Sequence, residues 1–231
     1  MTVVKQAMKK GMVVVTSGST NGYLVEELLA KKIDKTGYMT GKTLPASVSE
    51  KDLIKGEAIG DIIFKNGKLT DEYNRQTAAE NLQQDDVFIK GANALNYQQG
   101  VAGICIGHPA GGTVGGALGH IIGKRAHLLI PVGLEKCTGT DIYQMAELAN
   151  QGSDEFDSVP RLWPVKGIIV TEIEALQTLF PVKAYHLASG GLAGAEGAVR
   201  LIVEGEPEII SSLKDFIAEI QGEPPFYSLK N

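Results

Sequence analysis

The chain has 231 residues, of which 43% are hydrophobic, and it carries a formal net charge of −5. That length is long for one domain and short for two large ones, and the apolar content is sufficient for a sizeable core. The charge argues against a nucleic-acid partner, which would need clustered Lys and Arg, and two cysteines, Cys105 and Cys137, are too few for a disulfide framework. We therefore expect a cytoplasmic protein in a reducing compartment.

The sequence contains no stretch typical of a secretion signal or a membrane span. Residues 1–10 carry charges, and no apolar run of signal-peptide length follows them. Residues 101–123 are the least polar long stretch, but they are rich in glycine and contain His108, Pro109 and His120. We therefore expect a soluble protein with no membrane partner.

Strands and helices alternate along the first part of the chain. Residues 2–10 have the spacing of a short amphipathic helix, and 12–15 form a β-branched run typical of a strand covered on both faces. A polar loop at 16–22 then leads into a helix, and 36–70 are broken by glycine and proline and include a predicted hairpin. Further helices are expected at 71–83, from about 113 and after 140, and strands at 86–90 and 127–132. This alternation predicts a doubly wound, mostly parallel, Rossmann-like α/β domain over residues 1–160.

The C-terminal part has a different order of elements. Residues 151–164 are polar and contain proline, so we interpret them as a linker. The elements expected beyond it are strands at 167–171, 182–188, 198–204 and 225–229 and helices at 172–180 and 207–220. The order β-α-β-β-α-β is that of a ferredoxin-like α+β domain, here over residues 161–231. A domain this small is near the lower limit for independent stability, so we expect it to pack on the first domain or on a partner in a homo-oligomer.

The loop at 16–22 has the chemistry of an anion-binding turn between a strand and a helix. Its glycines permit backbone conformations barred to larger residues, its hydroxyls are hydrogen-bonding groups, and the helix that follows directs free N–H groups at the loop. The predicted ligand-binding residues are Ser17, Gly18, Ser19, Thr20, Asn21 and Gly22. The alternative is that one of these polar residues only caps the helix. The loop lacks the Gly-Lys-Ser/Thr of a P-loop, and its glycines miss the dinucleotide-binding spacing.

Other loops are expected at the same edge of the sheet, because ligands of parallel sheets bind beyond the carboxyl ends of the strands. The candidate segments are 90–95, 107–113 and 133–137. From them we predict the ligand-binding residues Lys90, Gly91, Ala92, Asn93, Gly111 and Gly112. Lys90 could neutralise a bound anion as a point charge, or it could lie exposed at the end of its strand.

Two of these segments carry a resemblance to a known superfamily. Ser17-Gly18-Ser19-Thr20 after one buried strand, and Lys90-Gly91-Ala92-Asn93 after another, resemble the superfamily of ribose-5-phosphate isomerase, glucosamine-6-phosphate deaminase and CoA transferases. Members of the lactate-utilisation protein group share a similar pattern. The resemblance covers residues 10–135, and in the isomerases the Gly-Ser-Thr loop holds the sugar phosphate. It therefore implies a phosphate on Gly18, Ser19 and Thr20.

The departures from the isomerase pattern bear on catalysis. Asp-Gly-Ala-Asp of the isomerases corresponds here to residues 90–93, and Asn93 cannot accept a proton as a carboxylate does. The expected Lys-Gly-Gly loop appears as residues 108–112, where His108 could act as a base or could cap the next helix. Glu135 could act as a nucleophile, as the CoA-transferase glutamate does, or could be a solvated loop charge. His108 and Glu135 are the catalytic candidates.

These patterns favour a protein that binds a small phosphorylated or carboxylated metabolite. The first hypothesis is an enzyme related to the sugar-phosphate isomerases and CoA transferases. The second is a non-catalytic binding or regulatory protein on the same fold, which Asn93 favours. The third is a structural subunit in which the C-terminal domain mediates assembly. We expect no cofactor and no metal, because the histidines and cysteines do not form a close ligand set.

Overall fold

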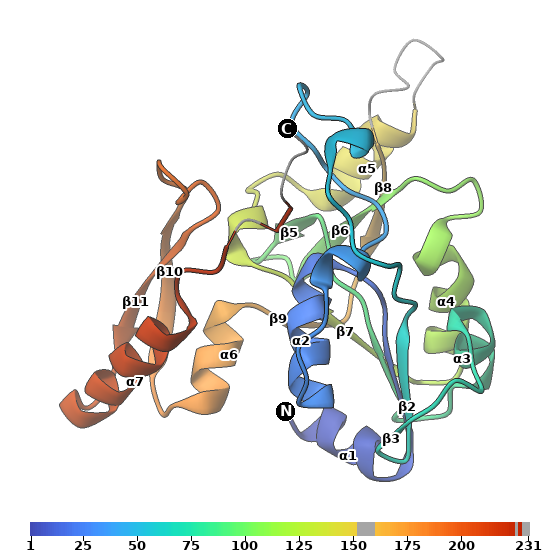
Figure 1. The fold of residues 1–231 in the computed structure, drawn as a ribbon, viewed down its shortest axis with the longest axis horizontal. Coiled ribbons are helices and arrows are strands. Elements are labelled where there is room, and N and C mark those ends of the chain that lie inside the picture. The colour runs from blue at the N-terminus through green and yellow to red at the C-terminus, as the bar shows by residue number, and fades with distance from the viewer. Residues whose placement is uncertain (152–159, 225, 228–231) are drawn as a thin grey trace.

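The computed structural model describes residues 1–151, 160–224 and 226–227. Within these ranges the protein has a mixed α/β fold around a mostly parallel central sheet, as predicted (Figure 1). The strand order in this sheet is β3-β2-β1-β4-β7-β9. The strands are β1 (Met12–Val15), β2 (Ile62–Lys65), β3 (Lys68–Leu69), β4 (Val87–Ile89), β7 (His127–Pro131) and β9 (Ile168–Val170). Strands β1, β4, β7 and β9 pair in parallel, whereas β2 is antiparallel to both β1 and β3.

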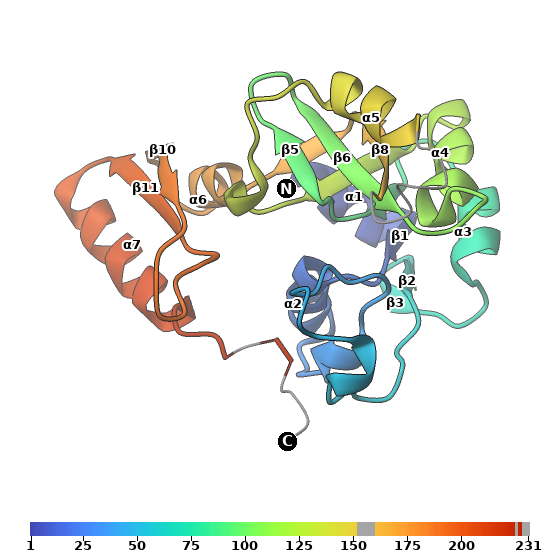
Figure 2. The same cartoon turned by 90° about the horizontal axis from the view of Figure 1, so that it is seen from above.

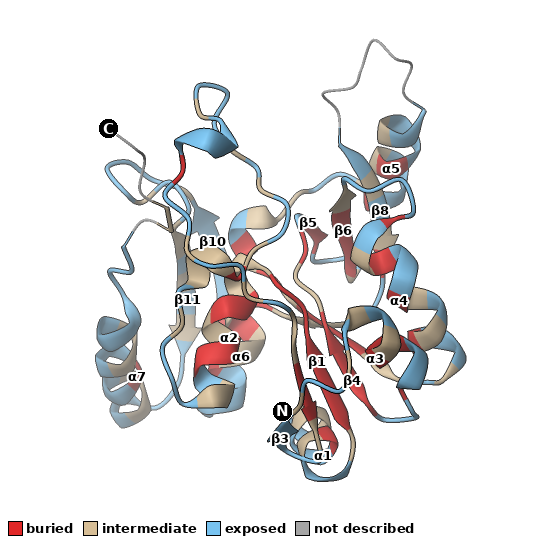
Figure 3. Ribbon diagram, turned by 45° about the vertical axis from the view of Figure 1, so that its right-hand side comes forward, coloured by how far each residue is buried: buried red, intermediate tan, exposed pale blue. Residues whose placement is uncertain are grey.

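The central strands are buried on both faces (Figure 3). In β1, Met12 and Val14 belong to one apolar core and Val13 and Val15 to the other, because successive strand side chains point to opposite faces. Helices α1 (Thr2–Lys10) and α2 (Ser19–Leu29) contribute to the second core. Helices α3 (Arg75–Asn81) and α4 (Gly112–Gly123) contribute to the first. The uninterrupted β-branched run at 12–15 thus forms the buried strand that its composition predicted.

A second sheet packs beside the first, and one of its strands includes residues that were predicted to be a linker. It has three strands in the order β5-β6-β8, namely β5 (Ala94–Asn96), β6 (Val101–Ile106) and β8 (Arg161–Val165), and α5 (Ile142–Asn150) packs on it. Residues 161–164 were predicted as linker because of Pro160 and Pro164, but they pair antiparallel with β6. Pro164 is tolerated because β8 is an edge strand, where a missing N–H interrupts no ladder. The predicted linker residues 152–159 lie outside the described residues.

The C-terminal unit differs from the predicted ferredoxin-like sheet. Strand β9 was expected to pair within that unit, but it pairs with β7 of the central sheet. The hairpin of β10 (Lys183–Ser189) and β11 (Val199–Glu204) forms a two-stranded sheet, and α6 (Glu172–Leu179) and α7 (Pro207–Ile220) share a small core with it. In Figure 2 the hairpin and α7 lie to one side of the two sheets with α6 between them, and Leu134, which follows β7, belongs to the core of this unit. Residues 161–170 therefore contribute to the sheets of the predicted first domain, beyond the boundary at 160. Of the predicted strand 225–229, residues 225, 228 and 229 lie outside the described residues.

No described helix is both long enough and apolar enough to cross a membrane.

Candidate functional site

A cavity of about 470 Å³ opens beyond the carboxyl ends of β1 and β4. This is the edge at which a parallel sheet usually binds its ligands. Its wall is built from segments 17–21, 39–43, 90–93 and 105–107, together with Lys136, Pro160 and Arg161. Residues far apart in the sequence thus meet here because the parallel strands β1 and β4 end side by side.

The wall of the cavity carries an excess of positive charge. Lys42, Lys90, Lys136 and Arg161 line it, and no Asp or Glu does among the described residues. The Nζ of Lys42 lies 3.7 Å from Glu50 Oε1, and that of Lys136 lies 3.9 Å from Glu135 Oε1. In the described part of the chain, no ion pair joins Lys90 or Arg161 to a carboxylate. A cavity of this charge attracts anions.

The N-terminus of α2 lies in the same wall and adds unused hydrogen-bond donors. Gly18 is the N-cap residue, and its N–H donates to the carbonyl of Tyr38 at 3.0 Å. No side chain caps the helix, so the capping role considered for the polar residues of the loop is not observed. The N–H groups of Ser19, Thr20 and Asn21 begin the helix and have no acceptor among the described residues. Such N–H groups, with the positive end of the helix dipole, bind phosphate or carboxylate.

Asn21 combines deep burial with an unsatisfied acceptor. Its side chain is only 1% exposed, and its Nδ2 donates to the carbonyl of Thr16 at 2.8 Å. Its Oδ1 has no hydrogen-bond partner among the residues that the structure describes. A buried acceptor left unpaired costs about 1–3 kcal/mol, so a donor supplied by a ligand or an ordered water molecule would stabilise the site.

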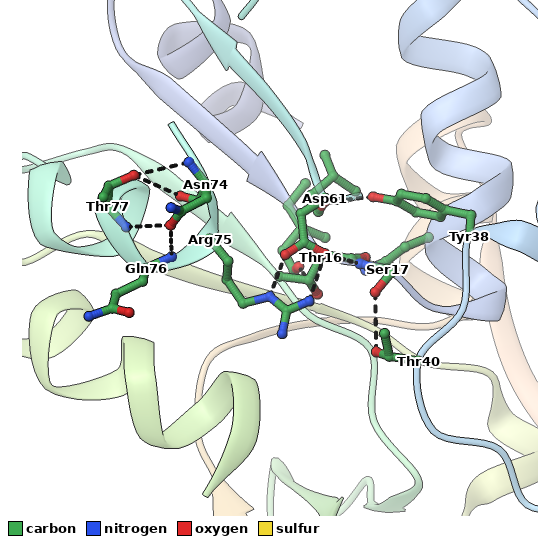
Figure 4. A network of polar contacts seen from close by, with 12 residues as sticks. Thr16, Ser17, Tyr38, Thr40, Asp61, Asn74, Arg75, Gln76 and Thr77 are labelled. Carbon is green, nitrogen blue, oxygen red and sulfur yellow. Dashed lines mark hydrogen bonds and ion pairs between the residues drawn. The ribbon is translucent and has the colours of Figure 1, made fainter. Parts of the chain in front are cut away.

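The loop after β1 is held in place by a buried carboxylate, that of Asp61 (Figure 4). Asp61 Oδ1 accepts from the backbone N–H of Ser17 at 2.8 Å and from Arg75 Nη2 at 3.1 Å, and Arg75 Nε donates to Asp61 Oδ2. Ser17 Oγ and Thr40 Oγ1 are 3.2 Å apart, which joins the loop to segment 39–43. Tyr38 Oη donates to the carbonyl of Val15 at 2.6 Å, and burial raises the pKa of this phenol. Asp61 therefore orders the loop and neutralises Arg75.

Lys90 lies at the end of β4 with an amine that forms no ion pair in the described structure. The residue is half-buried, and its Nζ donates a long hydrogen bond of 3.3 Å to the carbonyl of Gly91. Burial lowers the pKa of Lys90, and the charges of Arg75 and Lys136 lower it further. Beside it in the wall, burial raises the pKa of the Cys105 thiol, whereas Lys90 opposes that rise.

The structure brings most of the predicted ligand-binding residues together and separates others from them. Those that line the cavity are Ser17, Gly18, Ser19, Thr20, Asn21, Lys90, Gly91, Ala92 and Asn93. Gly22 does not, and a Cβ at this position would lie 3.1 Å from Lys35 Cγ. Asn93 Oδ1 accepts from the N–H of Cys105 at 2.9 Å, which ties the second loop to β6.

The two catalytic candidates lie outside the cavity wall. His108 is exposed, its Nδ1 accepts from the N–H of Ala110 at 3.1 Å, and it lines a second hollow with Gly111 and Trp163. Gly112 begins α4 and lines neither hollow. These residues follow β6, which belongs to the smaller sheet, so their loop runs toward β8 rather than toward β1. Glu135 is exposed beside Lys136.

Several residues of the cavity were not predicted individually as ligand-binding residues, although Gly107 and Lys136 lie within candidate segments. Segment 40–43 has the sequence Thr-Gly-Lys-Thr, a Gly-Lys-Thr step in a region to which we had assigned no role. Lys136 adjoins the predicted Glu135, and Arg161 fell in the predicted linker. The others are Met39, Cys105, Ile106, Gly107 and Pro160. The Gly-Lys-Thr step was the one available signal, because Gly-Lys-Ser/Thr residues bind phosphates in other loops.

No protein-family model, curated protein or solved structure matches this chain. The superfamily resemblance therefore depends on the loop sequences, and the function must be inferred from the cavity. Among the described residues, no three His, Cys, Asp or Glu side chains are placed to hold a metal ion.

Proposed function

We propose that this protein binds a small phosphorylated or carboxylated metabolite in the cavity beyond β1 and β4. The observation that carries the proposal is the composition of the wall: four basic side chains, no described carboxylate and the uncapped N-terminus of α2. A volume of about 470 Å³ falls in the range of small-molecule sites. The Oδ1 of Asn21, which has no hydrogen-bond partner among the described residues, can accept a hydrogen bond from a ligand or from an ordered water molecule.

We also propose membership of the superfamily of ribose-5-phosphate isomerase, glucosamine-6-phosphate deaminase and CoA transferases, on a Rossmann-like domain. The parallel pairing of β1, β4, β7 and β9 and the position of residues 18–20 at the cavity support this. The β10–β11 hairpin with α6 and α7 supports a ferredoxin-like relationship only in part, because β9 belongs to the other sheet.

A binding or regulatory protein is the second candidate function. Asn93 stands where the isomerases have a carboxylate, and neither His108 nor Glu135 lines the cavity. Isomerase-like proton transfer therefore has no described carboxylate base in the wall.

A cytoplasmic location is proposed from the two unpaired cysteines. A homo-oligomer is proposed from the β10–β11 hairpin, which exposes Tyr185, Leu187 and Ile202.

A thermal-shift series tests the proposal. The probes are inorganic phosphate, sugar phosphates, small organic acids and acyl-CoAs, each compared with potassium chloride at equal ionic strength. We expect one anion class to raise Tm, and the rise to shrink in Lys42→Ala. Lys214→Ala is the matched control, because it removes the same charge from the exposed face of α7. If no anion raises Tm above the chloride control, the proposal fails.

A further inference from the structure

We infer that Lys90 is a covalent site, at which its Nζ forms an imine with an aldehyde or ketone that also carries the anionic group. The inference rests on the proposed anion site, and it narrows the ligand from any small anion to a carbonyl compound with a phosphate or carboxylate. It also gives Lys90 a role beyond that of a counter-charge.

The position of Lys90 is the first argument. It directly follows β4, a strand buried between parallel neighbours, so its backbone is held rigidly at the edge of the cavity. The other two cavity lysines each lie near a carboxylate, Lys42 near Glu50 at 3.7 Å and Lys136 near Glu135 at 3.9 Å. Lys90 has no such partner in the described structure, and its amine donates a hydrogen bond of 3.3 Å to the carbonyl of Gly91. No carboxylate of the described residues pairs directly with this amine to hold it in its ammonium form.

The surrounding charges are the second argument. The groups that act on Lys90 are Arg75, Lys136, Asp61 and Cys105. Burial, Arg75 and Lys136 lower the pKa of the amine, whereas Asp61 and Cys105 oppose them, and the net direction is down. Asp61 is itself engaged by Arg75 and by the N–H of Ser17. A lysine that is desolvated beside other cations is the kind that reacts with carbonyl substrates.

The proposed step balances without any group besides the carbonyl compound. The lone pair of the neutral amine attacks the carbonyl carbon, a C–N bond forms, and the C=O π electrons move to oxygen. A proton passes from nitrogen to that oxygen and gives a carbinolamine. Loss of the hydroxyl as water, with a second proton, leaves the C=N bond. The N–H groups at the start of α2, with Lys42 and Arg161, hold the anionic end of the compound meanwhile.

Reductive trapping of the full chain tests the inference. The probe is pyridoxal 5′-phosphate, used only as an aldehyde that bears a phosphate, with sodium borohydride to reduce the imine and peptide mass spectrometry to locate the label. We expect Lys90 to be labelled faster than the exposed Lys214, because a lowered pKa leaves a larger fraction of its amine neutral and able to attack the carbonyl. Excess inorganic phosphate should protect Lys90 and leave Lys214 unaffected. The same experiment with glyoxylate, an aldehyde that bears a carboxylate, and sodium cyanoborohydride tests whether the site accepts a carboxylate in place of a phosphate.

Two variants complete the test. Lys90→Arg keeps a basic side chain but removes the primary amine, so it should abolish the fast label, whereas Lys214→Arg should leave the label intact. Because mapping is done on the wild-type chain, the result does not depend on the folding of Lys90→Arg. Labelling of Lys90 no faster than of Lys214, or without protection by phosphate, overturns the inference. Stabilisation by phosphate with an unreactive Lys90 overturns the imine alone, and absence of both effects overturns the anion site as well.

Discussion

The carboxylate of Asp61 accepts a hydrogen bond of 2.8 Å from the backbone N–H of Ser17, although the two residues are 44 positions apart in the sequence. Ser17 follows the end of β1, and Asp61 precedes the start of β2. Because the same carboxylate pairs with Arg75, one buried group both fixes the loop after β1 and neutralises that guanidinium (Figure 4). Asp61 thus supports a loop of the cavity without lining the cavity itself.

Replacing this carboxylate should loosen the loop. In Asp61→Asn, the ion pair with half-exposed Arg75 is lost and the acceptor for Ser17 is weakened, so we expect the free energy of unfolding to fall by about 1–3 kcal/mol. Urea denaturation measures this. Asp215→Asn on the exposed side of α7 is the matched control and should change stability by less than about 0.5 kcal/mol. Equal effects of the two variants would contradict a structural role for Asp61.

The guanidinium of Arg161, which forms no ion pair with the described residues, should contribute directly to anion affinity. Arg161→Ala is expected to weaken phosphate binding by about tenfold, which corresponds to about 1.4 kcal/mol. Raising the ionic strength should weaken the wild-type affinity and narrow the difference, because salt screens exposed charges. Isothermal titration calorimetry at two salt concentrations measures both effects. Lys214→Ala should match the wild type at each salt concentration, and an equal loss in that variant would show that net charge alone is responsible.

Acid should act on stability through Glu26 on α2. Burial of this carboxylate would raise its pKa, but the N–H of Ile33 and the amines of Lys35 and Lys32 outweigh burial, and the pKa is lowered below 4.5. A lowered folded-state pKa contributes stability that is present above the unfolded value and is lost as pH falls through the folded value. The stability difference between wild type and Glu26→Gln should therefore shrink below about pH 4.5. Urea midpoints of both proteins measured from pH 6 to pH 3 test this. A stability difference that grows as the pH falls would contradict the prediction.

The central sheet could be predicted from the sequence because strands that are buried on both faces appear there as short, uninterrupted apolar runs. Strand β6 could not, because Gly103 and the glycines after it resemble a loop. This strand is fixed by a local hairpin with β5 on one side and by long-range pairing with β8 on the other. Because residues 161–164 pair with β6, they form a strand and not the predicted linker, and Arg161 lies in the cavity wall.

The two loops of the candidate site were predictable because each directly follows a strand of the parallel sheet. The remaining wall was not, since Lys42 reaches the cavity from an irregular segment whose position depends on contacts such as Ser17 with Thr40. His108 was assigned to the site because residues 108–112 stand where the isomerases have a Lys-Gly-Gly loop. That loop follows β6, a strand of the smaller sheet that the sequence did not predict.

Gly111, predicted as a ligand-binding residue, should instead have a packing role at the start of α4. It has φ +77°, and a Cβ there would lie 2.6 Å from Trp163 Cζ3 and 3.0 Å from Gly115 Cα. Gly111→Ala is therefore expected to destabilise the protein by about 1–3 kcal/mol and to shift the fluorescence of Trp163, while phosphate affinity stays unchanged. Gly119→Ala is the matched control in the same helix, where a Cβ meets nothing within 4 Å, and it should stabilise by about 0.5–1 kcal/mol. Loss of phosphate binding in a folded Gly111→Ala protein would return this residue to the binding site.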